Sequence, residues 1–150
     1  MPLSSDIIVG LPGETFESTL QSVKDIIHAD VDEVLIWTLM MLDGSELNVP
    51  MEREKWNIKT KYRVIPRDFV KLSNGKVVLE IEEVGISTST LSFKEYVNLR
   101  LLALVVKVTK TGLVFDPILK FLQEQNLDIF DLVYNMAYRS NHIRKHYEII

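Results

Sequence analysis

Residues 6–15 read Asp6-Ile7-Ile8-Val9-Gly10-Leu11-Pro12-Gly13-Glu14-Thr15, and they join an apolar run to an amphipathic one. The β-branched run at residues 7–9 favours a strand buried on both faces, as in a parallel sheet. Gly10 and Gly13 permit backbone angles that other residues disfavour, and Pro12 fixes φ between them. Thr15 is a suitable N-cap for a helix. The stretch therefore predicts a strand, a tight turn and a helix, an arrangement that often places ligands in α/β proteins.

A second apolar run follows at the distance expected for a βαβ unit. Residues 16–29 have helical periodicity, with one apolar face formed by Phe16, Leu20, Val23, Ile26 and Ile27. Residues 34–39 read Val-Leu-Ile-Trp-Thr-Leu, which favours a second buried strand. Residues 6–39 therefore predict two parallel strands joined by a right-handed crossover. The turn Asp43-Gly44-Ser45 is then expected at the same sheet edge as residues 10–15.

The remainder of the chain predicts a hairpin followed by helices. Residues 62–65 favour a strand that ends at Pro66, and Ser73-Asn74-Gly75-Lys76 between apolar runs is a strong hairpin signal. Alternation over residues 77–82 suits a half-exposed antiparallel strand. Helix starts are indicated by the capping box Ser92-Phe93-Lys94-Glu95, by Asp116-Pro117 and by Asp128. We therefore expect an α/β protein in two parts, residues 1–66 and 67–150.

The composition excludes several classes of function. The chain has 150 residues, 47% of them hydrophobic, which is enough for a folded domain with a core. A net charge of −4 argues against binding to nucleic acid through phosphate neutralisation. There is no cysteine, so disulfides and thiolate-held metal centres are excluded within the chain. The sequence predicts no signal peptide and no membrane span, and we expect a cytoplasmic protein.

The turn at Gly10–Thr15 is the leading candidate site. Backbone N–H groups at a helix start can cradle an anion, but the same pattern also occurs as a plain strand–helix turn. It is neither a Walker loop nor a dinucleotide fingerprint. His142 and His146 share a helix face at zinc-ligand spacing, although a basic helix end explains them as well.

Charged residues of the hairpin region offer weaker candidates. We interpret Glu80, Glu82 and Glu83 as a solvated strand face rather than as a pair of catalytic carboxylates. Arg63 and Arg67 could bind phosphate or carboxylate, but surface ion pairs are the commoner outcome. The sequence predicts no catalytic residue and no metal site.

Several segments in order resemble radical S-adenosylmethionine (SAM) proteins of the cobalamin (B12)-binding-domain type. The matching segments are residues 6–15, the helix to His28, and residues 34–47. Residues 62–69 and 82–96 also match, so that the resemblance covers about residues 6–100. It implies part of a (β/α) barrel, followed by the β-hairpin and a C-terminal helical region. In such enzymes a [4Fe–4S] cluster reduces SAM, which binds at the carboxyl ends of the barrel strands.

The resemblance implies that the turns of this chain border SAM. The resemblance implies that the SAM-proximal residues are Gly10, Pro12, Gly13 and Glu14, and that Gly44 and Ser45 border the same cavity. The family's Cys-x-x-x-Cys-x-x-Cys motif and cobalamin domain are absent from this chain. We therefore expect a C-terminal fragment of an iron–sulfur enzyme of oxidoreductase or methyltransferase type, inactive alone, with the cluster, SAM and cobalamin in the full-length parent.

The open strand edges of such a fragment predict self-association. The partners are then the remainder of the parent enzyme and a second copy of the chain, joined by edge pairing or by exchange of an element. Two alternatives remain: a free-standing α/β interaction domain whose turn is only structural, and a small phospho-ligand-binding module that uses the turn at residues 10–15.

Overall fold

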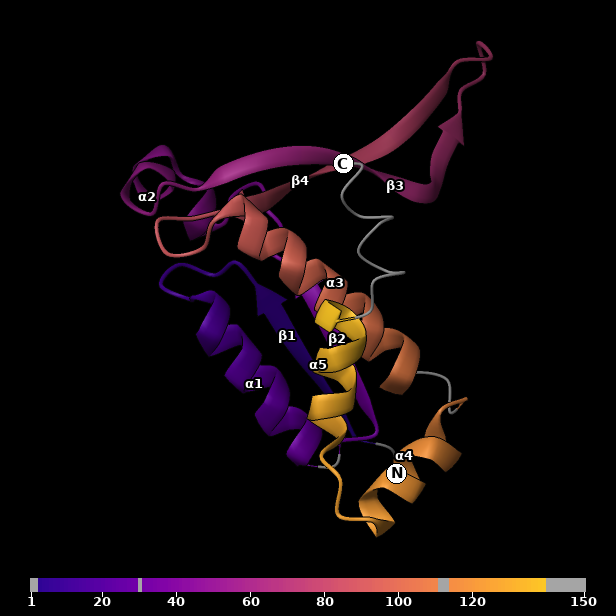
Figure 1. Ribbon diagram of the computed structural model, residues 1–150. Helices are drawn as coiled ribbons and strands as arrows, with labels where there is room; N and C mark the ends of the chain where they lie inside the picture. The colour runs from indigo at the N-terminus through magenta and orange to yellow at the C-terminus, as the bar shows by residue number, and fades with distance from the viewer. Residues whose placement is uncertain (1–2, 30, 111–113, 140–150) are drawn as a thin grey trace.

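The computed structural model describes residues 3–29, 31–110 and 114–139, with the backbone alone at 66–68. Its elements are β1 (Ser4–Val9), α1 (Phe16–His28), β2 (Glu33–Thr38), a short 3-10 helix η1 (Glu46–Asn48), α2 (Pro50–Lys55), β3 (Lys59–Lys71), β4 (Val77–Ser87), α3 (Phe93–Lys110), α4 (Asp116–Glu124) and α5 (Ile129–Arg139). The result is a mixed α/β fold whose described strands form two small sheets and close no barrel (Figure 1).

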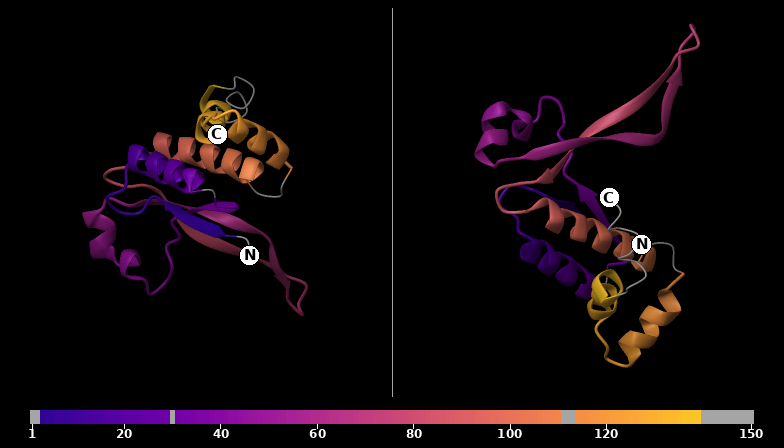
Figure 2. Two further views of the ribbon diagram at one scale, coloured as in Figure 1. Left: turned by 90° about the horizontal axis from the view of Figure 1, so that it is seen from below. Right: turned by 45° about the horizontal axis from the view of Figure 1, so that its top comes forward.

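The predicted βαβ unit is confirmed. β1 and β2 are parallel, with Ile7 opposite Ile36 and Val9 opposite Thr38, and α1 connects them. The expectation that these strands are buried on both faces is wrong. Val9 and Val34 are fully buried, whereas Ile8 is 43% and Trp37 50% exposed. Among the described residues, helices cover only one face of the pair: α1 and α3 lie on the same side, and α4 and α5 lie beyond them (Figure 2).

The two sheets meet directly after β2. Met41 N donates to Glu83 O at 2.9 Å, and Gly85 N donates to Leu39 O at 2.9 Å. Since Leu39 N also donates to Val9 O at 3.1 Å, this short segment links the end of β1 to the base of the β3–β4 hairpin. Leu39, Met41 and Ile58 form a small core there, separate from the main one.

The predicted hairpin is confirmed and is longer than expected. Gly75 has φ +80° in the turn, and Leu72 N donates to Lys76 O at 2.8 Å across it. β3 does not end at Pro66 but continues to Lys71. The pairing of β3 with β4 shifts register between Val64 and Phe69, and a strand can contain a proline at such an irregular position. The strand therefore crosses the boundary expected at residue 66. The division into two parts stays a prediction, although both parts contribute to one core.

The helices form the main core with β1 and β2. Leu99, Leu102 and Val106 of α3 pack with Val23 of α1 and Val133 of α5. The Ser92–Glu95 capping box is confirmed, since Ser92 N donates to Oε2 of Glu95 at 2.7 Å. Asp128 caps α5 as predicted, accepting from Phe130 N at 2.8 Å.

One helix start differs from the prediction. Asp116 lies inside α4 rather than before it, and the preceding Phe115 gives no side-chain cap.

Among the described residues, no helix is both long enough and apolar enough to cross a membrane.

Candidate functional site

The turn after β1 has the geometry that its glycines predict. Glu14 N donates to Leu11 O at 3.1 Å, closing a four-residue turn. Pro12 requires a negative φ, and Gly13 has φ +85°, which together define a type II turn. Gly10 has φ +92° where β1 ends. The turn is therefore rigid and lies at the carboxyl end of the parallel pair.

The start of α1 satisfies its own donors. Thr15 is the N-cap: its Oγ1 accepts from Ser18 N at 3.1 Å, and Ser18 Oγ accepts from Thr15 N at 2.9 Å. Thr19 N donates to Thr15 O at 3.1 Å. Because these contacts use donors that an anion would need, they favour a structural role of the helix start over phosphate binding.

Glu14 is the most unusual residue of the turn. Its Oε2 is buried and has no hydrogen-bond partner within the described part of the chain. Burial raises the pKa of the Glu14 carboxyl, against the opposing effect of the backbone N–H groups of Leu11 and Gly10. Thr90 Oγ1 donates to Glu14 O at 2.6 Å, which ties the turn to the loop before α3. Glu14 thus has one buried carboxyl oxygen whose hydrogen-bonding capacity no described residue uses.

Gly44 and Ser45 form a second turn at the same end of the sheet. Gly44 has φ +81°, and the N–H and hydroxyl groups of Ser45 both donate to Leu42 O, at 3.1 and 2.8 Å. The two turns are connected by packing, because Leu11 of the first and Leu47 after the second both contact the small core around Leu39. The structure therefore brings together the regions that hold all six candidate residues.

A polar network lies beside this end of the β1–β2 sheet, and it was not predicted from the sequence. Arg53 of α2 donates to both carboxylate oxygens of Glu83, at 2.9 and 2.5 Å, and to Oδ1 of Asn48. Thr60 Oγ1 also donates to Glu83. The hydrogen bonds from Arg53 and Thr60 hold the pKa of the Glu83 carboxyl below its usual range. Asn48 Nδ2 donates in turn to Met41 O at 3.2 Å, so that the network fastens α2 to the hairpin base.

The interpretation of the three glutamates as a solvated face is therefore wrong for two of them. Glu83 is bound by Arg53, and Glu82 is bound by Arg63 across the hairpin. Only Glu80 is exposed as expected. No local pattern could have revealed the Arg53 pair, because 30 residues separate its members.

The remaining sequence candidates give no further site. His142 and His146 lie outside the described residues, as does the side chain of Arg67. No group of three or more metal-ligating side chains occurs in residues 3–29, 31–110 and 114–139.

Neither a family of known proteins nor any single curated protein matches the sequence.

Proposed function

We propose that this chain is the C-terminal part of a radical SAM enzyme of the cobalamin-binding-domain type. In this proposal it contributes the turn at residues 10–14 to the SAM site and two strands to a partial (β/α) barrel. One observation carries the proposal: β1 and β2 are parallel, the described helices lie on one face of the pair, and Ile8 and Trp37 are exposed on the other.

The argument rests on how parallel sheets are stabilised. Parallel strands occur almost entirely in folds that cover both faces of the sheet. In a (β/α) barrel the helices lie outside, and the inner face is covered by the other strands of the barrel. An uncovered inner face that carries an isoleucine and a tryptophan therefore supports a role within a larger assembly.

The turn residues fit SAM. The buried Oε2 of Glu14 lacks a partner within the described residues, and SAM carries an ammonium group and ribose hydroxyls that could donate to it. Gly10 and Gly13 allow close approach of a ligand, since a side chain at Gly13 would point into open space. When bound with its cluster, SAM supplies a 5′-deoxyadenosyl radical. The residues of this chain would only bind and orient it.

The residues of this chain do not fit the [4Fe–4S] cluster. The sequence contains no cysteine, so that the thiolate ligands must come from the remainder of the parent enzyme. The chain alone is then inactive, and cobalamin would likewise be bound elsewhere in the parent. We place that parent among cytoplasmic iron–sulfur enzymes of oxidoreductase or methyltransferase type.

The proposal is tested first by sequencing the DNA upstream of the Met1 codon. An in-frame coding region with Cys-x-x-x-Cys-x-x-Cys supports it, whereas a stop codon with no cysteine-bearing gene beside it contradicts it. The longer protein, reconstituted anaerobically with iron and sulfide and then reduced with dithionite, should form 5′-deoxyadenosine and methionine from SAM. Glu14→Gln in that protein should raise the Kd for SAM about tenfold, and Glu17→Gln, on the exposed side of α1, should leave it unchanged.

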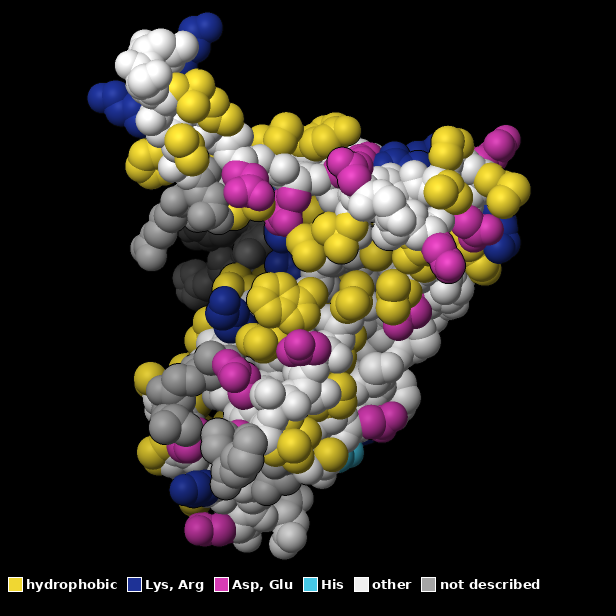
Figure 3. Space-filling model, turned by 180° about the vertical axis from the view of Figure 1, so that it is seen from behind, with side chains coloured by type: hydrophobic (Ala, Val, Ile, Leu, Met, Phe, Trp, Pro, Cys, Tyr) yellow, Lys and Arg dark blue, Asp and Glu magenta, His cyan; other side chains and the backbone are white. Residues whose placement is uncertain are grey.

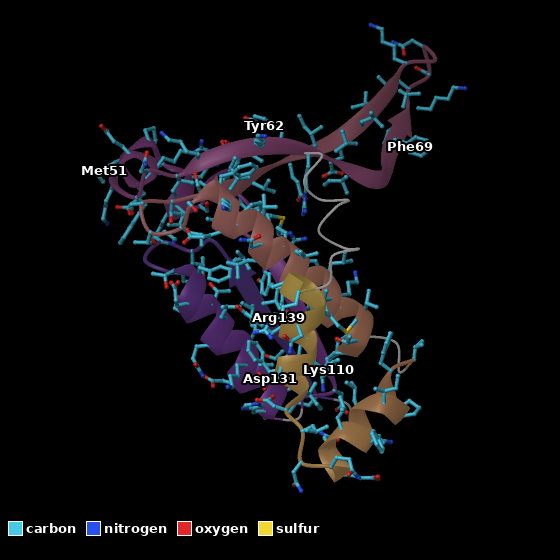
Figure 4. The ribbon with its side chains drawn as sticks, viewed as in Figure 1. Met51, Tyr62, Phe69, Lys110, Asp131 and Arg139 are labelled. Carbon is cyan, nitrogen blue, oxygen red and sulfur yellow. The ribbon has the colours of Figure 1, made fainter. Side chains whose placement is uncertain are left out.

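A free-standing interaction domain is the second candidate, and a different observation favours it. The outer part of the hairpin exposes large apolar residues on both strands, among them Phe69 (61% exposed) and Leu79 (54%). Figure 4 shows Phe69 far from the helices, on the projecting part of the hairpin. Exposed apolar patches of this kind mark surfaces that bind another protein. A stop codon upstream of the Met1 codon, with no cysteine-bearing gene beside it, would favour this candidate.

A further inference from the structure

A groove lies beside the edge of β2 that faces away from β1. It is lined by consecutive residues of β2, by one residue of β3 and by one face of α3, namely Leu35, Ile36, Trp37, Thr38, Arg63, Arg100, Ala103, Leu104 and Lys107. Its volume is about 470 Å³, within the range of sites that hold small organic molecules. None of the candidate residues of the turns lines it.

The groove is positively charged in a chain whose net charge is −4. Its lining includes the cations Arg63, Arg100 and Lys107 and no carboxylate. Figure 3 shows Lys and Arg side chains in the hollow below the hairpin, with acidic side chains above them and hydrophobic ones beside them. Cations gathered in one concavity focus the potential and attract anions.

Two of these cations have N–H donors that no described residue uses, and these donors could bind a ligand. Arg100 donates from one terminal nitrogen to Ile36 O at 3.1 Å, which holds the guanidinium along the edge of β2. Within the described residues its other N–H groups have no partner, and neither has the exposed ammonium of Lys107. Arg63 is engaged by Glu82, so that it adds less to the potential.

The groove also offers an apolar surface. Trp37 is 50% exposed, and Leu104, which lies between Arg100 and Lys107 in the sequence of α3, is 42% exposed. Arg100, Leu104 and Lys107 are spaced by four and three residues, and therefore share one helix face. Trp37 lines the same groove as these three residues, so that a flat ring stacked on it would share the groove with their side chains.

We propose that this groove binds an organic anion that carries a flat aromatic ring. Arg100 and Lys107 hold the anionic group, and Trp37 stacks on the ring. The guanidinium fork matches phosphate and carboxylate equally, so that the shared chemistry is an aromatic anion. Addition of a peptide strand to β2 is less favoured, because Arg100 already occupies the Ile36 carbonyl. The inference does not depend on the proposed enzyme.

The test is calorimetric titration of the full 150-residue chain with AMP and with 1-naphthoate. Adenosine and inorganic phosphate serve as the two halves of AMP. At least one aromatic anion should bind saturably, and more tightly than the ring or the phosphate alone. Preference for AMP or for naphthoate identifies the anionic group as phosphate or carboxylate.

Matched variants locate the site. Arg100→Ala should weaken binding about tenfold and Lys107→Ala about threefold. Lys94→Ala, on the same helix but outside the lining, should change nothing. Trp37→Leu should weaken the binding of AMP but not the binding of inorganic phosphate. Because Lys107 is exposed, its variant keeps the test valid even if Arg100→Ala unfolds.

Three outcomes would overturn the proposal. The first is the absence of saturable binding of both aromatic anions at millimolar concentration. The second is binding that Lys107→Ala and Lys94→Ala affect equally. The third is binding of a glutamate-rich peptide without binding of either aromatic anion, which would assign the groove to a protein partner.

Discussion

The body of the protein and its hairpin arm contain similar apolar residues in opposite environments. We define the body as β1, β2, α1, α3, α4 and α5, and the arm as residues 64–81, the outer part of the hairpin. Val9, Val34 and Val106 of the body are fully buried, whereas Val70, Leu79 and Ile81 of the arm are 60%, 54% and 58% exposed. Both regions contain hydrogen-bonded strand pairs, although the pairing of the arm shifts register between Val64 and Phe69. Strand formation therefore does not by itself imply burial, which requires a second layer.

The junction explains why only one region is packed. Helices cover one face of β1 and β2, but β3 and β4 diverge from β2 beyond the bridge between Met40 and Val84. Val84 at the hairpin base is 5% exposed, and the strands lose this cover further out (Figures 1 and 2). A two-stranded hairpin is only marginally stable in water, so that we expect the arm to bind a further surface.

The largest expected effect contrasts equal substitutions in the two regions. Leu102→Ala in the body should lower the free energy of unfolding by about 2–5 kcal/mol, because Leu102 is 1% exposed and its removal leaves a cavity. Leu79→Ala in the arm should change it by less than about 1 kcal/mol. Urea denaturation followed by circular dichroism measures both. Equal losses would show that the arm is packed in solution.

The second prediction concerns the ion pairs along the hairpin. Arg53→Ala should destabilise the protein by about 2 kcal/mol, because it leaves the largely buried Glu83 carboxylate without its bidentate partner. Arg63→Ala, which removes a more exposed partner of Glu82, should cost less than about 1 kcal/mol. Urea denaturation ranks the two variants by their loss of unfolding free energy. The reverse order would contradict the role assigned to the Arg53 network.

The third prediction is self-association of the isolated chain. The open strand edges and the exposed arm should make the sedimentation coefficient rise with concentration in the micromolar range. The double substitution Phe69→Ser and Leu79→Ser should abolish the rise if the arm forms the contact, and leave it if the edge of β1 does. A monomer at every concentration would refute pairing of either kind.

The fourth prediction compares two glycines with the same backbone conformation. Gly13 (φ +85°) and Gly75 (φ +80°) both have open space where a Cβ would lie, so that substitution adds strain without a clash. Gly13→Ala should lower global stability by about 1 kcal/mol. Gly75→Ala should instead increase amide exchange at the tip of the arm and leave global stability nearly unchanged. Hydrogen exchange with denaturation separates the two results.

The smallest effects are expected from two carboxyls of the body whose pKa values shift in opposite directions. Burial opposes ionisation of Asp128, but His28, Phe130 N and Lys24 together lower its pKa below the usual 3.8. Asp128 therefore contributes stability above pH 3.8 that is lost as the pH falls through its folded pKa. Asp128→Asn should cost less than about 1 kcal/mol at pH 7, and the cost should shrink as the pH falls through the folded pKa of Asp128.

Glu14 should behave in the opposite way. Its pKa is raised above 4.5, so that its favourable contribution is present at lower pH and is lost as the pH rises through the folded pKa. Glu14→Gln should therefore leave the protein at least as stable as the wild type at pH 7. Urea denaturation across the acid range checks both carboxyls, and a loss of stability from Glu14→Gln at pH 7 would reveal a partner for its charge.

Local features of the candidate site were predictable, and its long-range contacts were not. The positive φ of Gly10 and Gly13, the Thr15 cap and the parallel pairing of the two strands follow from residue types at short spacing. The burial of Glu14 Oε2, which has no partner among the described residues, depends on tertiary contacts that local sequence does not show. The groove of Trp37 and Arg100 was missed, because 64 residues separate Arg100 from the Ile36 carbonyl that orients it.

The sequence by itself determined the turns, the caps of α1, α3 and α5, and the element order of this protein. These features depend on the conformational preferences and hydrogen bonds of residues within a few positions of one another. Only the tertiary structure decided which strand faces are buried, which partner Glu83 takes and where the cations of α3 converge. Those outcomes depend on surfaces brought together from distant parts of the chain, so that a leucine in the body is buried and a leucine in the arm is exposed.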